Sequence, residues 1–201
     1  MTAEPLRHVV ILAHPNPQSF NAAVAAAYRK AAEALGHSVM TRDLYAVGFD
    51  PRLSAGEIPG GELASAPPEI AAERALLADA DVFAFIYPLW FNAPPAILVG
   101  YVQRVFGMGF GYGPQRGGEN QRLLPGRRLI SFSSSGAPEE WLRAEGAWEA
   151  LRTLFDRHVA GVCGMTALEH RHFGAVTPSA PRTRLAAHLA GVREVVRANF
   201  A

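Results

Sequence analysis

Residues 8–36, HVVILAHPNPQSFNAAVAAAYRKAAEALG, contain the transition that decides the fold. The run HVVILA (8–13) is short, apolar and rich in β-branched residues, which is typical of a strand buried on both faces. From residue 22 onward apolar positions recur with helical spacing, and Gly36 stands where a helix would end. The loop between them, HPNPQSFN (14–21), has no glycine and carries a histidine, two prolines, amides and a serine. The segment predicts a strand, a polar loop and a helix in immediate succession.

The same alternation of strand and helix signals continues along the chain. Further strands are predicted at 37–44, 81–87, 127–133 and within 161–170, and further helices at 67–80, 95–106, 138–159 (in two pieces around Gly146) and 181–200. Residues 45–67 and 107–126 are rich in Gly and Pro and are predicted to be loops. Alternating apolar strands and helices imply a parallel sheet with helices on both faces. Five such strands fit a doubly wound, flavodoxin-like α/β sheet of order 2-1-3-4-5, and the length predicts one domain over residues 1–201.

Composition and charge narrow the class of protein. Hydrophobic residues make up 49% of the 201 residues, which suits a globular chain. The net charge of +1 gives no reason to expect nucleic acid or an anionic membrane as a partner. No signal peptide is visible, and no uncharged stretch reaches the roughly 18 residues of a membrane span. The single cysteine, Cys163, excludes an internal disulfide and fits a reducing compartment, so we expect a cytoplasmic protein without membrane insertion.

Three unusual loops follow the first, third and fourth predicted strands: HPNPQSFN (14–21), PLWFNAPP (88–95) and SSSGAP (133–138). Parallel strands bring such loops to one edge of the sheet, where ligands bind. In the first loop, Ser19 and Asn21 stand at a helix start, whose free N–H groups and positive dipole end can bind phosphate, and His14 adds a donor. The alternative is that Ser19 is an ordinary N-cap. Glycine-rich Rossmann and P-loop motifs are absent from the sequence.

The other two loops offer an aromatic wall and a polar rim. Trp90 and Phe91 lie between prolines that stiffen the backbone, and their rings suit a flat conjugated ligand. The alternative is that both rings pack beneath the loop. The serines of SSSGAP supply hydroxyl and backbone N–H groups for a polar ligand edge, or merely form a turn. Taken together, a phosphate site, an aromatic wall and a polar rim predict a flavin site.

The chain resembles the NAD(P)H:quinone oxidoreductase family of flavodoxin-like flavoproteins along most of its length. AHPNPQSFN (13–21) is similar to the family's first-strand loop, and RDLYAVGFDPRLS (42–54) is similar to the segment after its second strand. ADVFAFIYPLWFNAPPAILVGYVQRVF (80–106) resembles the third-strand signature. FGYG (110–113) and LISFSSSGA (129–137) fall where the family has a Phe-Ala-Tyr segment and a Thr-Thr-Gly-Gly turn.

This resemblance implies a flavin cofactor, NAD(P)H as hydride donor, and a quinone or similar electron-poor aromatic as acceptor, in a homodimer. It implies that the phosphates are held by His14, Ser19, Phe20 and Asn21; the isoalloxazine by Pro88, Leu89, Trp90 and Phe91; and its pyrimidine side by Ser133, Ser134, Ser135 and Gly136. Tyr112 would close the site, from its own subunit or from the partner. FAD is favoured over FMN, because residues 45–67 match the loop that helps to house the adenylate in the larger relatives.

One departure from the family affects the expected chemistry. After the Thr-Thr-Gly-Gly turn, the best-known members carry a Tyr and then a His that steady charge on the flavin. Counted without gaps, these positions are Trp141 and Ala147, and neither side chain can take that role. The departure leaves open a regulatory, flavin-binding accessory subunit of an ion-efflux system. A flavodoxin-type electron carrier is a third possibility, which the near-neutral charge disfavours.

Two other features are weighed against simpler explanations. His170 and His172 are predicted to lie on the same side of an extended chain, as a metal pair would, but no third ligand is nearby in the sequence. We therefore expect no metal site. Cys163 lies between apolar residues of the predicted fifth strand, so we interpret it as part of the core rather than as a nucleophile.

Overall fold

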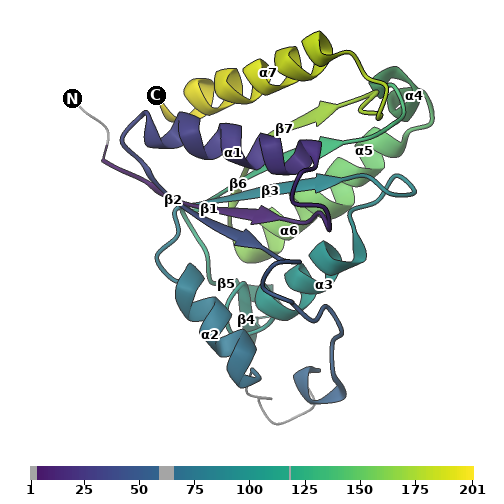
Figure 1. Cartoon of the computed structure of the whole chain (residues 1–201). Coiled ribbons are helices and arrows are strands. Elements are labelled where there is room, and N and C mark those ends of the chain that lie inside the picture. The colour runs from purple at the N-terminus through teal and green to yellow at the C-terminus, as the bar shows by residue number, and fades with distance from the viewer. Residues whose placement is uncertain (1–3, 59–65, 118) are drawn as a thin grey trace.

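The computed structural model describes residues 4–58, 66–117 and 119–201. Its central sheet has five parallel strands in the order β2-β1-β3-β6-β7 (Figure 1). The strands are β1 (Arg7–Leu12), β2 (Ser38–Asp43), β3 (Val82–Pro88), β6 (Arg128–Ser134) and β7 (Thr166–Phe173). Since β6 and β7 are the fourth and fifth parallel strands along the chain, the predicted flavodoxin-like order is confirmed.

Helices cover both faces of this sheet. On one face lie α1 (Phe20–Glu33) and α7 (Arg182–Phe200), side by side in Figure 1, and they enclose a core with residues such as Val10, Tyr28 and Phe132. The opposite face is covered by α2 (Pro68–Leu77), α3 (Ala96–Val105), α4 (Glu139–Ala144), α5 (Ala147–Leu151) and α6 (His158–Cys163). Every residue of β3 is buried, because helices cover the strand on both sides.

The predicted helix at 138–159 is interrupted twice. Gly146 has a φ of 71°, in the left-handed region that favours glycine, and it separates α4 from α5 as expected. A π-helical segment, η2 (Arg152–Arg157), then joins α5 to α6. Segments of this kind are rare and often lie at functional sites.

Two sequence predictions were wrong in detail. Residues 107–126 are not all loop, because an antiparallel hairpin forms between β4 (Tyr112–Arg116) and β5 (Glu119–Arg122). The predicted fifth strand starts late, at Thr166, and Cys163 ends helix α6 instead of lying in a strand. The prediction that Cys163 is a core residue is confirmed, and burial raises the pKa of its thiol to about 11.

Within 45–67, Ala55–Glu57 form a short 3₁₀ turn, η1, and residues 59–65 lie outside the described residues. In the part of the chain that the structure describes, no helix is long and apolar enough to cross a membrane.

Candidate active site

The start of α1 is built by the loop that follows β1. Ser19 has extended backbone angles, and its Oγ accepts a hydrogen bond of 3.1 Å from the N–H of Ala22, so Ser19 is an N-cap. Asn16 shapes the turn before it, accepting at its Oδ1 from Gln18 N at 2.8 Å and at its carbonyl from Ser19 N at 3.1 Å. No described residue accepts from the N–H groups of Phe20 and Asn21, the first two of the helix. The capping alternative for Ser19 is therefore confirmed, and two free donors remain at the positive end of the helix dipole.

The side chain of Asn21 faces inward and joins two of the three loops. It is 3% exposed, and its Oδ1 accepts a hydrogen bond of 2.9 Å from Ser134 Oγ at the end of β6. The carbonyl of Ser134 accepts in turn from Leu89 N at 2.7 Å. The predicted convergence of the loops after β1, β3 and β6 at one edge is thus formed by direct bonds. Asn21 holds the loops together through its side-chain oxygen, which leaves its backbone N–H available to a phosphate.

His14 lies beside the aromatic loop. Its Nδ1 accepts from Asn16 N at 3.0 Å, and its ring centroid is 6.0 Å from that of Trp90. Partial burial lowers the pKa of His14 below its usual value, against the opposing influence of Asp43. The imidazole is therefore held as a neutral donor or acceptor between two of the predicted cofactor-binding loops.

The aromatic loop forms a tight two-residue turn. Trp90 and Ala93 exchange two backbone hydrogen bonds, and between them Phe91 and Asn92 have φ values of 52° and 58°. A left-handed conformation is costly for a residue with a large side chain such as Phe91, and strain of this kind gathers at binding sites. The side chain of Phe91 is fully exposed and Trp90 is half-exposed, whereas Leu89 is buried. The alternative that both rings pack beneath the loop is therefore wrong for Phe91.

The third loop begins with serines that point to alternate faces of β6. Ser133 and Ser135 face one way and Ser134 the other, while Gly136 is exposed and has open space around it. A Cβ on Gly136 would meet only Thr177 Cγ2, at 3.9 Å. The turn therefore leaves room for a ligand edge next to its backbone.

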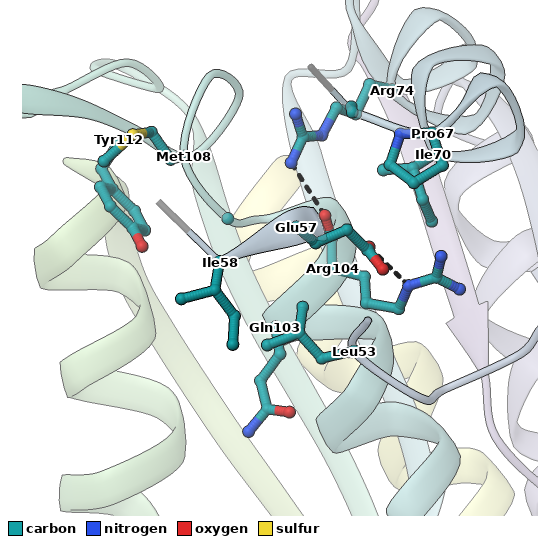
Figure 2. Close-up of a pocket in the computed structure, with 12 residues that line it drawn as sticks. Leu53, Glu57, Ile58, Pro67, Ile70, Arg74, Gln103, Arg104, Met108 and Tyr112 are labelled. Carbon is teal, nitrogen blue, oxygen red and sulfur yellow. Dashed lines mark hydrogen bonds and ion pairs between the residues drawn. The ribbon is translucent and has the colours of Figure 1, made fainter. Parts of the chain in front are cut away.

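Tyr112 lies elsewhere in this chain. With Arg74, Gln103 and Met108 it lines a pocket between α2, α3 and the start of β4 (Figure 2). The pocket holds about 140 Å³, less than the roughly 300–1,000 Å³ usual for ligand sites. The structure does not bring Tyr112 together with the three loops of its own chain, so its predicted closing role is not met within one chain.

The two positions matched to the family's Tyr and His lie in α4 and α5. Trp141 is half-exposed, with 47% of its surface accessible, and Ala147 packs against the core. The neighbouring Trp148 is buried, with its ring centroid 4.7 Å from that of His170 and 5.7 Å from that of His172. Trp148 thus covers a polar cluster that the sequence reasoning did not predict.

That cluster joins Asp156 to the serines of β6. His170 bonds Asp156 Oδ2 through Nδ1 at 2.6 Å and Ser133 Oγ through Nε2 at 2.7 Å. His172 bonds Ser133 Oγ through Nδ1 at 2.8 Å and Ser135 Oγ through Nε2 at 2.9 Å. The prediction that the two histidines share a side is confirmed. All four ring nitrogens of the two histidines take part in hydrogen bonds, and no cluster of three potential metal ligands is found among the described residues.

Comparison with known proteins identifies the family. A family model described as "Flavodoxin-like fold" matches residues 7–196. The chain belongs to this family. It is 31% identical over 172 residues to an uncharacterized NAD(P)H oxidoreductase of Haemophilus influenzae, covering 85% of each chain.

Solved structures agree with this assignment. The NAD(P)H:quinone oxidoreductase from Methanothermobacter marburgensis superposes with a TM-score of 0.85 at 26% identity, over 98% of each chain. A more distant structure is the FMN-dependent NADH-azoreductase from Bacillus anthracis in complex with FMN, with a TM-score of 0.71 at 16% identity over 98% of this chain and all of that one. This last likeness shows the fold alone. The resemblance to NAD(P)H oxidoreductases expected from the sequence is confirmed.

Proposed function

We propose that this protein is a flavin-dependent NAD(P)H:quinone oxidoreductase. The observation that carries the proposal is the convergence of three loops at the carboxyl edge of the sheet, joined through Ser134 to Asn21 and to Leu89. Its relatives support it, since the Haemophilus protein is named an NAD(P)H oxidoreductase and the Methanothermobacter protein an NAD(P)H:quinone oxidoreductase.

The residues at this edge fit a flavin in three respects. The free N–H groups of Phe20 and Asn21 at the start of α1 suit a phosphate. The turn at Trp90 and Phe91 exposes two aromatic faces. Gly136 leaves open space where the backbone can approach a ring edge. We therefore keep the sequence-predicted roles of His14, Ser19, Pro88, Leu89 and Ser135 as proposals, with Ser19 and Asn21 acting through the backbone that they shape. Ser133 is fully buried between His170 and His172, so its side chain does not face the ligand.

A flavin bound here would take a hydride from NAD(P)H and pass it to the acceptor. The protein's own part is to bind and to orient. The start of α1 anchors the phosphate, and Trp90 and Phe91 form a wall against which a nicotinamide and then a quinone can stack. Because NAD(P)H and the quinone would occupy the same face of the flavin one after the other, we expect ping-pong kinetics.

The decisive test is the purified protein's visible spectrum, with the released flavin identified by mass, followed by steady-state NADH and NADPH oxidation with a benzoquinone. A flavin spectrum together with turnover supports the proposal. Bound flavin without turnover would favour the accessory-subunit alternative, and a colourless protein that flavin does not reconstitute would refute the proposal. The released mass also decides between FAD, which we favour, and FMN.

A substitution in the aromatic turn provides a sharper test. Phe91→Asn removes the ring but suits the left-handed backbone, so it should weaken flavin binding while leaving thermal stability equal or higher. Leu154→Asn, which also removes an exposed apolar side chain, is the control and should leave flavin affinity unchanged. Unchanged affinity in Phe91→Asn would mean that Phe91 is no part of the cofactor site.

We further propose that the active form is a homodimer. Tyr112 lines a small pocket away from the three loops, so it can cover a flavin only in a neighbouring subunit. A monomer that retains full activity at nanomolar concentration, shown by light scattering and assay, would contradict this proposal.

A further inference from the structure

Five side chains form one continuous hydrogen-bonded chain inside the fold. It runs from Asp156 in η2 through His170, Ser133 and His172 to Ser135, with every link between 2.6 and 2.9 Å. The registry of β6 and β7 produces it, because Ser131 pairs with His170 and Ser133 with His172, and alternate residues share a face. All five side chains belong to buried residues.

Part of the chain has the distances of a Ser–His–Asp triad, but burial excludes that chemistry. Ser133 is 0% exposed, so no substrate carbonyl can reach its Oγ. Its hydroxyl is also placed between two imidazoles rather than facing a cleft. A nucleophilic role is therefore excluded, whereas an unbroken series of donors and acceptors is suited to carry a proton.

The direction of each hydrogen bond follows from Ser135, the end of the chain at the turn after β6. Ser135 Oγ donates its only proton to the carbonyl of Ala137, at 2.9 Å, so it accepts from His172 Nε2. Burial is the main cause that lowers the pKa of His172, to about 4, so its ring is neutral and its Nδ1 accepts from Ser133. Ser133 then accepts from His170 Nε2.

This direction requires a second proton, besides the one on His170 Nε2, at the Asp156–His170 end of the chain. Since His170 Nε2 carries a hydrogen, its Nδ1 can bond Asp156 only if the pair holds one more proton, on the ring or on the carboxyl group. Ser131 Oγ, at 2.8 Å, donates to the other carboxylate oxygen. The Asp156–His170 pair therefore stores one proton that the chain can release by reversing every bond.

We propose that this chain is a proton relay between the Asp156–His170 pair and the cofactor turn, and that it replaces the Tyr and His that the family places after that turn. This inference rests on the proposed function. Its outer residue, Ser135, is next to the exposed Gly136 in the loop predicted to meet the flavin's pyrimidine side. Transfer of a hydride from NAD(P)H would add one negative charge to the isoalloxazine of a bound flavin. A proton delivered at the turn would neutralise that charge.

The transfer balances atom by atom. His170 passes its Nε2 proton to Ser133, Ser133 passes its own to His172 Nδ1, and His172 passes its Nε2 proton to Ser135. Ser135 breaks its bond to the Ala137 carbonyl and gives its own hydroxyl proton to the ligand. The proton shared with Asp156 stays on His170 Nδ1, opposite a carboxylate. No electron moves along the chain. When the hydride leaves for the acceptor, the proton returns by the same route and restores the pair.

The side chains packed around the hydrogen-bonded chain limit the loss of its protons to water. Trp148 covers both imidazoles, Tyr87 packs beside His170, and Phe155 packs against Tyr87. The charged and titratable groups that face the chain from neighbouring elements are Tyr87 of β3, Glu139 and Arg143 of α4, and His188 of α7. The phenol of Tyr87 is wholly buried, and burial raises its pKa, so it stays neutral.

The first test uses the flavin-free protein. Ring-nitrogen NMR of ¹⁵N-histidine-labelled protein at pH 7.5 should show His172 protonated at Nε2 and bare at Nδ1, and His170 with a proton at Nε2 and a second shared with Asp156. Ser135→Ala removes the outer acceptor and should shift the His172 pattern, whereas Ser135→Thr should restore it. Ser134→Ala, in the same turn but outside the chain, should leave both histidines unchanged. A His172 proton on Nδ1 in the wild type would overturn the relay.

The second test uses the flavin-loaded protein in stopped-flow. Ser135→Ala should slow flavin reduction by NAD(P)H about 10²-fold at saturating substrate, lose the solvent deuterium isotope effect, and recover part of the rate as the pH falls. A structural role alone would lower stability but leave the isotope effect and pH profile unchanged, and that result would overturn the relay. A protein that binds no flavin, yet shows the predicted NMR pattern, would refute the proposed function while leaving the chain's direction established.

Discussion

Arg104 holds the segment after β2 against α2 and α3, and its removal should be among the most destabilising single changes in the chain. Its guanidinium bonds Glu57 at 2.7 Å, Glu69 at 3.0 Å and the carbonyl of Asp50 at 2.6 Å. The side chains of Arg104 and Glu57 are 5% and 7% exposed. Figure 2 shows this pair at the pocket wall. In Arg104→Met the Glu57 carboxylate stays buried without its cation, and removing one partner of a buried ion pair costs about 3–5 kcal/mol.

For a domain of this size, such a loss corresponds to a fall in Tm of roughly 10 °C. Urea unfolding followed by circular dichroism measures the free energy of unfolding directly. Arg52→Met is the control, since its ion pair with Asp50 is exposed to solvent and its loss should change the free energy of unfolding far less than Arg104→Met does. The double variant Glu57→Leu/Arg104→Met should lose less than the single one, because no uncompensated charge is left. A loss below about 1 kcal/mol in Arg104→Met would refute this reasoning.

Three further changes test other parts of the structure. Asn21→Ala leaves the buried hydroxyl of Ser134 without its acceptor and should lower the free energy of unfolding by about 1–3 kcal/mol, while Asn21→Asp, which keeps an oxygen there, should lose less in the same urea titration. Gly100→Ala places a Cβ on the backbone of Pro51, so partial proteolysis should cut the segment after β2 faster than in the wild type. Burial lowers the pKa of His8 to about 4, so below pH 6.5 the unfolded chain binds a proton there that the folded chain does not. From pH 7.5 to 5 this histidine should account for about 2 kcal/mol of lost stability, so the fall measured in His8→Asn should be smaller than that of the wild type by about this amount.

The parallel sheet was predictable because its strands are read from local composition. The buried strands β1 and β3 are continuous apolar runs, and the segments between them carry helical periodicity. The hairpin of β4 and β5 was not predictable in this way, because β4 contains Gly113 and Pro114 and the hairpin has no apolar alternation. Contacts distant in sequence hold this region: Leu123 N donates to the carbonyl of Gly111, and Leu124 N to that of Cys163. In this hairpin, hydrogen bonds to residues distant in the sequence outweigh a low local β-propensity.

The candidate site was predictable to the level of its loops, because parallel topology alone brings strand ends together. The buried hydrogen-bonded chain from Asp156 to Ser135 was not predicted, because its residues come from three elements. One of these elements, η2, is a π-helical segment that has no sequence signature. A signal did exist. Ser131, Ser133 and Ser135 alternate along the predicted fourth strand and the turn after it, and His170 and His172 alternate at and just beyond the end of the predicted fifth, so five polar side chains on one buried face should have been expected to bond one another.

Ser134 explains why the three loops act as one site. Its carbonyl accepts from Leu89 N, its hydroxyl donates to Asn21, and the next residue, Ser135, donates its N–H to the carbonyl of Phe173 at the end of β7. The three loops are therefore fixed relative to one another before any ligand arrives, and little ordering entropy is lost when a ligand binds. The same bonds place the start of α1, where we propose that a phosphate binds, and the Ser135 end of the Asp156 chain on opposite sides of one residue. A shift of the β6 turn would therefore disturb the proposed phosphate site and the proposed relay together, so variants of this turn must be judged on both.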